Sequence, residues 1–103
     1  ALDEAVEGVV NGIFFNQGQV WCAGSRLLVQ EDIHDVFINK LEKRMQTLRV
    51  GNPLDKNTDI GAINSKDQLD KITDLVNEGV SDGGELFQIE CELPKNGFWF
   101  KPS

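Results

Sequence analysis

The most informative stretch of the sequence runs from Phe14 to Arg26 and reads Phe-Phe-Asn-Gln-Gly-Gln-Val-Trp-Cys-Ala-Gly-Ser-Arg. It joins the end of a predicted helix to a short apolar run through small residues and side-chain amides. A cysteine at such a junction, here Cys22, can meet backbone N–H groups that stabilise a thiolate or an oxyanion. A well-packed buried turn produces the same pattern, and on the residues alone it is the favoured interpretation.

Three helices are predicted around this stretch, at roughly residues 3–16, 32–49 and 65–82. The first has apolar residues at the i, i+3, i+4 and i+7 spacing of an amphipathic helix, and the second and third each carry an apolar stripe. Asp3 is expected to cap the first helix, and Ser65 with Gln68 forms a capping-box pair at the start of the third.

Short apolar runs at roughly residues 25–30, 85–89 and 98–101 have the composition of strands. Helices that alternate with short strands indicate an α/β fold class. No internal repeat or linker divides the chain, so we expect residues 1–103 to form one piece.

Charge and cysteine content exclude several classes of protein. The 103 residues carry a net charge of -7, which argues against nucleic-acid or membrane partners because phosphate binding needs clustered Lys and Arg. Two cysteines are too few for a disulfide scaffold, so a cytoplasmic location is expected. The chain starts at Ala1 without a Met, which suggests a piece of a longer protein.

Other common motifs of catalysis or metal binding are absent. The sequence has no GxGxxG, Walker, HExxH or CxxC pattern, and no metal site is predicted. His34 has no second ligand at a useful spacing and is interpreted as a solvated helix residue. Cys91 lies in a polar stretch and is interpreted as an unpaired thiol.

The pattern Phe-Phe-Asn-Gln-Gly-Gln-x-x-Cys-Ala-Gly-Ser-Arg resembles the active-site signature of the NAD(P)-dependent aldehyde dehydrogenases. The likeness continues at Val-Gly-Asn-Pro-Leu-Asp, residues 50–55, and at Gly-Phe-Trp-Phe-Lys-Pro-Ser, residues 97–103. Asp-Ile-Gly-Ala-Ile at residues 59–63, together with Ser-Arg-Leu-Leu-Val-Gln-Glu at residues 25–31, is most similar to the family-sixteen branch.

The resemblance implies a reaction. In the family a cysteine thiolate attacks the aldehyde carbonyl, hydride passes to the nicotinamide, and a general base activates the water that releases the acid. The family's base Glu, oxyanion Asn and dinucleotide-binding unit lie upstream of the matching segment. Residues 1–103 are therefore expected to be a partial catalytic domain that binds no NAD(P) itself. Its expected partner is the rest of the parent chain, with a homo-oligomer as a further possibility for the full-length protein.

One departure from the family pattern concerns the nucleophile itself. The family places its cysteine second after Gly-Gln, and here that position holds Trp21, with Cys22 one place later. An indole offers only an N–H donor and forms no adduct with an aldehyde. We therefore expect a catalytically silent homologue with a scaffolding or partner-binding role, in which Trp21 packs a core or tunnel. An active enzyme that uses Cys22 or a second catalytic unit is the alternative, and an unrelated small binding domain is a third.

Overall fold

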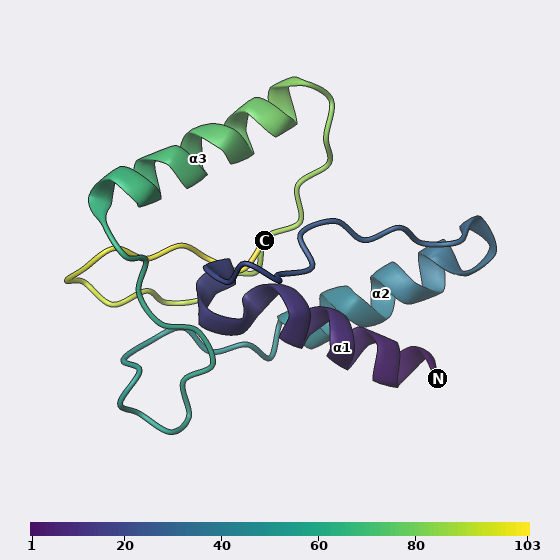
Figure 1. Ribbon diagram of the computed structural model, residues 1–103, viewed down its shortest axis with the longest axis horizontal. Coiled ribbons are helices and arrows are strands. Elements are labelled where there is room, and N and C mark those ends of the chain that lie inside the picture. The colour runs from purple at the N-terminus through teal and green to yellow at the C-terminus, as the bar shows by residue number, and fades with distance from the viewer. The chain divides into compact units, whose positions relative to one another are not determined.

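A computed structural model describes residues 1–103 (Figure 1). It divides into two compact units, residues 1–48 and 49–103, and each is described here by itself. The elements are helices and the segments that connect them. In chain order they are α1 (Leu2–Phe14), the 3-10 helices η1 (Phe15–Gly18) and η2 (Glu31–Ile33), α2 (His34–Met45) and α3 (Lys66–Ser81).

The first unit is built on the packing of α1 against α2. Each helix has an apolar stripe, and burying these two stripes against each other removes them from water. α1 contributes Val6 and Val10 to the core, and α2 contributes Phe37 and Met45. All four side chains are at most 5% exposed. The patterns that predict these two helices are therefore confirmed.

The start of α1 differs from the expectation that Asp3 caps it. The helix begins one residue earlier, with Ala1 at the N-cap and no side-chain cap hydrogen bond. Asp3 lies inside the first turn, where its carboxylate accepts a hydrogen bond from Lys40 Nζ at 2.8 Å. Asp3 therefore contacts the second helix and does not cap the first.

The second helix ends at Met45, four residues before its predicted end. Thr47 explains the early stop, because its hydroxyl donates to the Arg44 carbonyl at 2.7 Å and its own N–H bonds the same oxygen at 3.1 Å. Leu48 N–H then bonds the Met45 carbonyl, in the i→i+3 pattern of a tightened last turn.

The second unit contains α3 and the segments on either side of it. Ser65 is the N-cap of α3, and its hydroxyl accepts from the Gln68 N–H at 3.1 Å, so the predicted helix start is confirmed. The core of this unit consists of Ile60, Ile63 and Ile89. No residue of α3 itself is buried.

The predicted strands are not confirmed. Residues 25–30 form no ladder. Each of the other two runs makes a single backbone hydrogen bond to another segment, Ile89 N–H to Pro102 O and Ile63 N–H to Phe98 O. A strand needs a continuous row of such bonds to a neighbouring strand. The only bridge is an isolated parallel pair between Val50 and Ile60. The apolar runs therefore predict where the chain is extended, but they do not predict whether it pairs with a neighbouring strand.

None of the helices is long and apolar enough to cross a lipid bilayer.

Candidate functional site

The signature stretch forms a chain reversal after α1, and Trp21 and Cys22 lie at its tip. The Ala23 N–H donates to the Val20 carbonyl at 3.0 Å, so these two residues are the central pair of a four-residue turn. Both side chains are exposed, and the indole of Trp21 is 106% exposed relative to its reference area. The structure therefore brings the two sequence-predicted site residues to adjacent positions in one turn.

The exposure of Trp21 departs from the expectation that it packs a core or tunnel. No other residue of the 103 covers the indole. A fully solvated tryptophan is uncommon, because a side chain of this size gains free energy from burial. The turn presents the indole and the neighbouring thiol outward.

The backbone before this turn is left-handed over three successive residues. The φ values are 51° at Asn16, 56° at Gln17 and 78° at Gly18. Glycine adopts this conformation freely and asparagine tolerates it, whereas a residue such as glutamine does so at a cost. Asn16 Nδ2 donates to the Gln19 carbonyl at 3.2 Å, and the Gln19 N–H returns a bond to the Asn16 carbonyl at 3.0 Å. The Asn-Gln-Gly stretch is thus the element that reverses the chain.

A backbone hydrogen bond ties the far side of the turn to α1. The Gly24 N–H donates to the Gly12 carbonyl at 2.8 Å. Carbonyls in the last turn of a helix lack partners within the helix, and this bond satisfies one of them. Next to it, α1 and the returning chain border a groove of about 270 Å³, which Gly8, Gly12 and Arg26 help to line.

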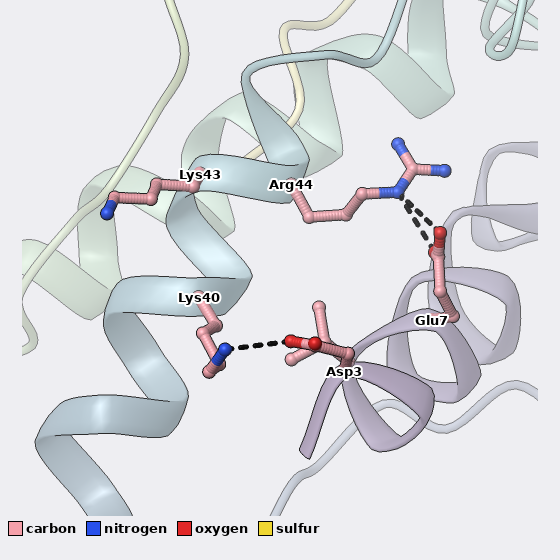
Figure 2. Close-up of a pocket in the computed structure, with 6 residues that line it drawn as sticks. Asp3, Glu7, Lys40, Lys43 and Arg44 are labelled. Atoms are coloured by element: carbon pink, nitrogen blue, oxygen red, sulfur yellow. Dashed lines mark hydrogen bonds and ion pairs between the residues drawn. The ribbon is translucent and has the colours of Figure 1, made fainter. Parts of the chain in front are cut away.

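A second groove, of about 300 Å³, lies between α1 and α2 (Figure 2). Lys40 Nζ lies 2.8 Å from Asp3 Oδ1, and Arg44 Nε lies 3.0 and 2.9 Å from the two carboxylate oxygens of Glu7. The hydrogen bond and the charge of Lys40 hold the pKa of Asp3 below its ordinary value of 3.8. Lys43 also lines the groove, but in Figure 2 its side chain points away from both carboxylates.

These ion pairs are features that the sequence interpretation missed. The two paired acids, Asp3 and Glu7, are four residues apart on α1, and so are their partners Lys40 and Arg44 on α2. That matched spacing is a signal that could have found the pairs, since residues four apart share one helix face. Because both acids are paired with bases across it, we interpret this groove as part of the contact between the two helices.

The remaining candidates are side chains on the surface. The side chain of His34, at the start of α2, is 55% exposed. Its Nδ1 lies 3.1 Å from Asp35 Oδ1. Cys22 and Cys91 are both free thiols. No group of three or more His, Cys, Asp or Glu side chains is placed to hold a metal ion.

Comparison with known proteins identifies the class. The sequence model of the aldehyde dehydrogenase family matches residues 1–103. The chain belongs to the aldehyde dehydrogenase family, and its three helices are part of that family's catalytic-domain fold.

Individual relatives agree with this assignment. The chain is 36% identical over 102 residues to cytosolic 10-formyltetrahydrofolate dehydrogenase of Xenopus laevis, a match covering 99% of this chain and 11% of the relative. It is 41% identical over 105 residues to retinal dehydrogenase 2 of Taeniopygia guttata, covering 99% of this chain and 20% of the relative. The crystal structure of an NAD-dependent aldehyde dehydrogenase from Sinorhizobium meliloti superposes with a TM-score of 0.90 at 35% identity, over 98% of this chain and 20% of the other.

The chain therefore spans a fifth or less of the length of these three relatives. Residues 1–103 form no strand–turn–helix unit of the kind that binds a dinucleotide in the Rossmann fold. The isolated bridge of Val50 with Ile60 is the only strand-like pairing, and no glycine-rich turn links a strand to a helix.

Proposed function

We propose that residues 1–103 correspond to the family's nucleophile segment in an aldehyde dehydrogenase-like protein that does not oxidise aldehydes and serves as a scaffold or partner-binding protein. The observation that carries this proposal is the side chain at position 21. Trp21 occupies the place of the family's cysteine in Gly-Gln-x-Cys and lies at the exposed tip of the turn. Its indole N–H can donate a hydrogen bond, but the ring supplies no nucleophile for a carbonyl carbon.

A second candidate function rests on Cys22. Its thiol is free and exposed and lies next to Trp21 in the same turn. A thiolate there could attack an aldehyde if the turn shifted by one residue, because adjacent side chains point in different directions. Under this alternative the parent protein is an active dehydrogenase, through Cys22 or through a second catalytic unit.

The finer assignments belong to the same proposal. We place residues 1–103 in a catalytic domain and the NAD(P)-binding residues elsewhere in the parent protein, which the chain's coverage of a fifth or less of its relatives supports. The family-sixteen branch is supported by Ser-Arg-Leu-Leu-Val-Gln-Glu at residues 25–31. The cytosolic name of the Xenopus laevis relative supports a cytoplasmic location. A homo-oligomer is proposed from family membership.

The test is labelling of the full-length protein with a thiol-reactive aldehyde analogue, read by peptide mass spectrometry. Each reaction is run with and without a free aldehyde as competitor, because an exposed thiol such as Cys22 reacts with any electrophile to some extent. Only labelling that the aldehyde suppresses reports a substrate-binding nucleophile. The set comprises the wild type, Trp21→Cys and Cys22→Ser, with Cys91→Ser as a control outside the turn.

The proposal predicts that labelling of Cys22 in the wild type is insensitive to the competitor. It predicts competitor-sensitive labelling of the introduced thiol in Trp21→Cys. Suppression of Cys22 labelling by the aldehyde, together with dehydrogenase activity that Cys22→Ser abolishes, would overturn the silent assignment in favour of the second candidate.

A further inference from the structure

The sequence contains two Asn-Gly pairs, Asn11-Gly12 and Asn96-Gly97, in different backbone environments. Such a pair is chemically labile, because glycine has no Cβ to hinder attack of its own backbone nitrogen on the preceding side-chain amide. Both asparagines are exposed. Gly12 lies inside α1, where the i→i−4 bonding of the helix holds its N–H. The Gly97 N–H lies outside any helix and donates to no carbonyl of the chain.

The indole of Trp99 contacts the peptide bond between Asn96 and Gly97. Its Nε1 donates to the Asn96 carbonyl at 2.7 Å. When the Gly97 nitrogen loses its proton, the negative charge is shared with this carbonyl oxygen, because both atoms belong to one conjugated amide. A hydrogen bond to a charged acceptor is stronger than one to a neutral acceptor. The indole N–H therefore favours ionisation of the nitrogen that would attack the Asn96 side chain.

The turn itself requires glycine at position 97. Gly97 has a φ of 103°, which residues with a Cβ rarely adopt. A Cβ at this position would also lie 3.0 Å from Trp99 Nε1. The residue that makes the pair labile is thus the one that lets the indole reach the Asn96 carbonyl.

We propose that Asn96 is a site of spontaneous deamidation that the Trp99 indole promotes. The Gly97 nitrogen gives its proton to water or hydroxide and attacks Cγ of Asn96, which closes a cyclic succinimide. The Cγ–Nδ2 bond breaks, and the leaving nitrogen takes up a proton and departs as ammonia. Water then opens the ring at Cγ to give aspartate, or at the main-chain carbonyl to give isoaspartate. One water is consumed and one ammonia released, and no oxidant or reductant is needed.

The products alter the second unit. Either product adds a negative charge at an exposed turn. Isoaspartate also lengthens the main chain shortly before Phe98, whose carbonyl accepts the Ile63 N–H at 2.7 Å. Because Ile63 belongs to the core of this unit, the isoaspartyl form acts on a bond between the turn and the core.

The experiment follows deamidation of the full-length protein in heavy-oxygen water at mildly alkaline pH, either native or denatured in guanidinium chloride. Digestion in ordinary water and peptide mass spectrometry then measure heavy oxygen at positions 96 and 11, so deamidation during digestion is not counted. Asn11 is the matched control within the chain, since it is an equally exposed asparagine before glycine. Trp99→Phe keeps an aromatic ring and removes the N–H donor.

Native Asn96 should deamidate about as fast as denatured Asn96, whereas native Asn11 should react about tenfold or more slowly than denatured Asn11. Trp99→Phe should slow native Asn96 about fivefold and leave both denatured rates unchanged. If folding suppresses the reaction at Asn96 as strongly as at Asn11, the site is excluded, and that comparison needs no variant. A native Asn96 rate in Trp99→Phe that equals or exceeds the wild-type rate would exclude promotion by the indole.

Discussion

The side chain at position 21 determines what this turn can do chemically. A thiol next to backbone donors becomes a nucleophile when it ionises, whereas an indole stays neutral and keeps its N–H. The sequence predicts that this is the family's nucleophile position, because Gly18-Gln19 sets the register of the signature. It did not reveal the left-handed backbone at Gln17, since glutamine carries no preference for that region. The exposure of Trp21 was likewise unexpected.

Ser65 offers a test of a single side chain whose role was predicted correctly. Ser65→Ala removes the hydroxyl that accepts from the Gln68 N–H, and it should destabilise α3 by about 1 kcal/mol. Amide exchange in the first turns of α3 should then accelerate about fivefold. Ser81→Ala at the last residue of α3 is the control and should leave those amides unchanged. Equal effects of the two substitutions would mean that the cap contributes no stability.

The pairing of α1 with α2 combines an apolar contact with two ion pairs. The apolar stripes were predictable from periodicity, because burial requires one face of each helix to be hydrophobic. The ends of the helices were less predictable. Tertiary or capping bonds set them: Lys40 takes the Asp3 carboxylate, and Thr47 closes α2 early. Such bonds depend on distant residues or side-chain rotamers that periodicity does not encode.

Phe37 tests the apolar part of this contact. It is 5% exposed, and Phe37→Ala should cost about 3–5 kcal/mol through lost burial and the cavity left behind. The measurement is amide-exchange protection of α1 and α2 in the full-length protein. The neighbouring Val36 is 52% exposed, so Val36→Ala should have a far smaller effect. A loss of protection as large in Val36→Ala would show that the wrong face of α2 has been assigned to the core.

Lys40 tests the ionic part through pH. Because Lys40 lowers the pKa of Asp3, the pair stabilises the contact above the ordinary carboxyl value of 3.8, and this stabilisation is lost as the pH falls through the lowered pKa. Lys40→Met should raise the pKa of Asp3 towards its ordinary value. An NMR titration of selectively labelled aspartate carboxyls measures this directly.

Lys43→Met is the matched control for that titration, since Lys43 lines the same groove without an ion pair to either acid. It should leave the Asp3 titration where it is. A similar rise in both variants would assign the shift to the general positive field of α2, and not to the Lys40 contact.

The chain as a whole is two units whose segments between helices are extended but almost unpaired. The composition of these segments predicted extended chain, but the strands it suggested are not confirmed, because β-pairing depends on neighbours that a local pattern does not specify. Three helices and family membership follow from periodicity and one signature, and both agree with the structure and its relatives. The proposal that the parent protein does not oxidise aldehydes depends on the residue at position 21.

The most direct test of that proposal is steady-state formation of NADH or NADPH by the full-length protein with a panel of aliphatic and aromatic aldehydes. The account predicts no rate above the protein-free blank for the wild type, and no change on Cys22→Ser. Aldehyde-dependent reduction of NAD or NADP by the wild type that Cys22→Ser abolishes would contradict it. The nucleophile would then be the thiol beside Trp21.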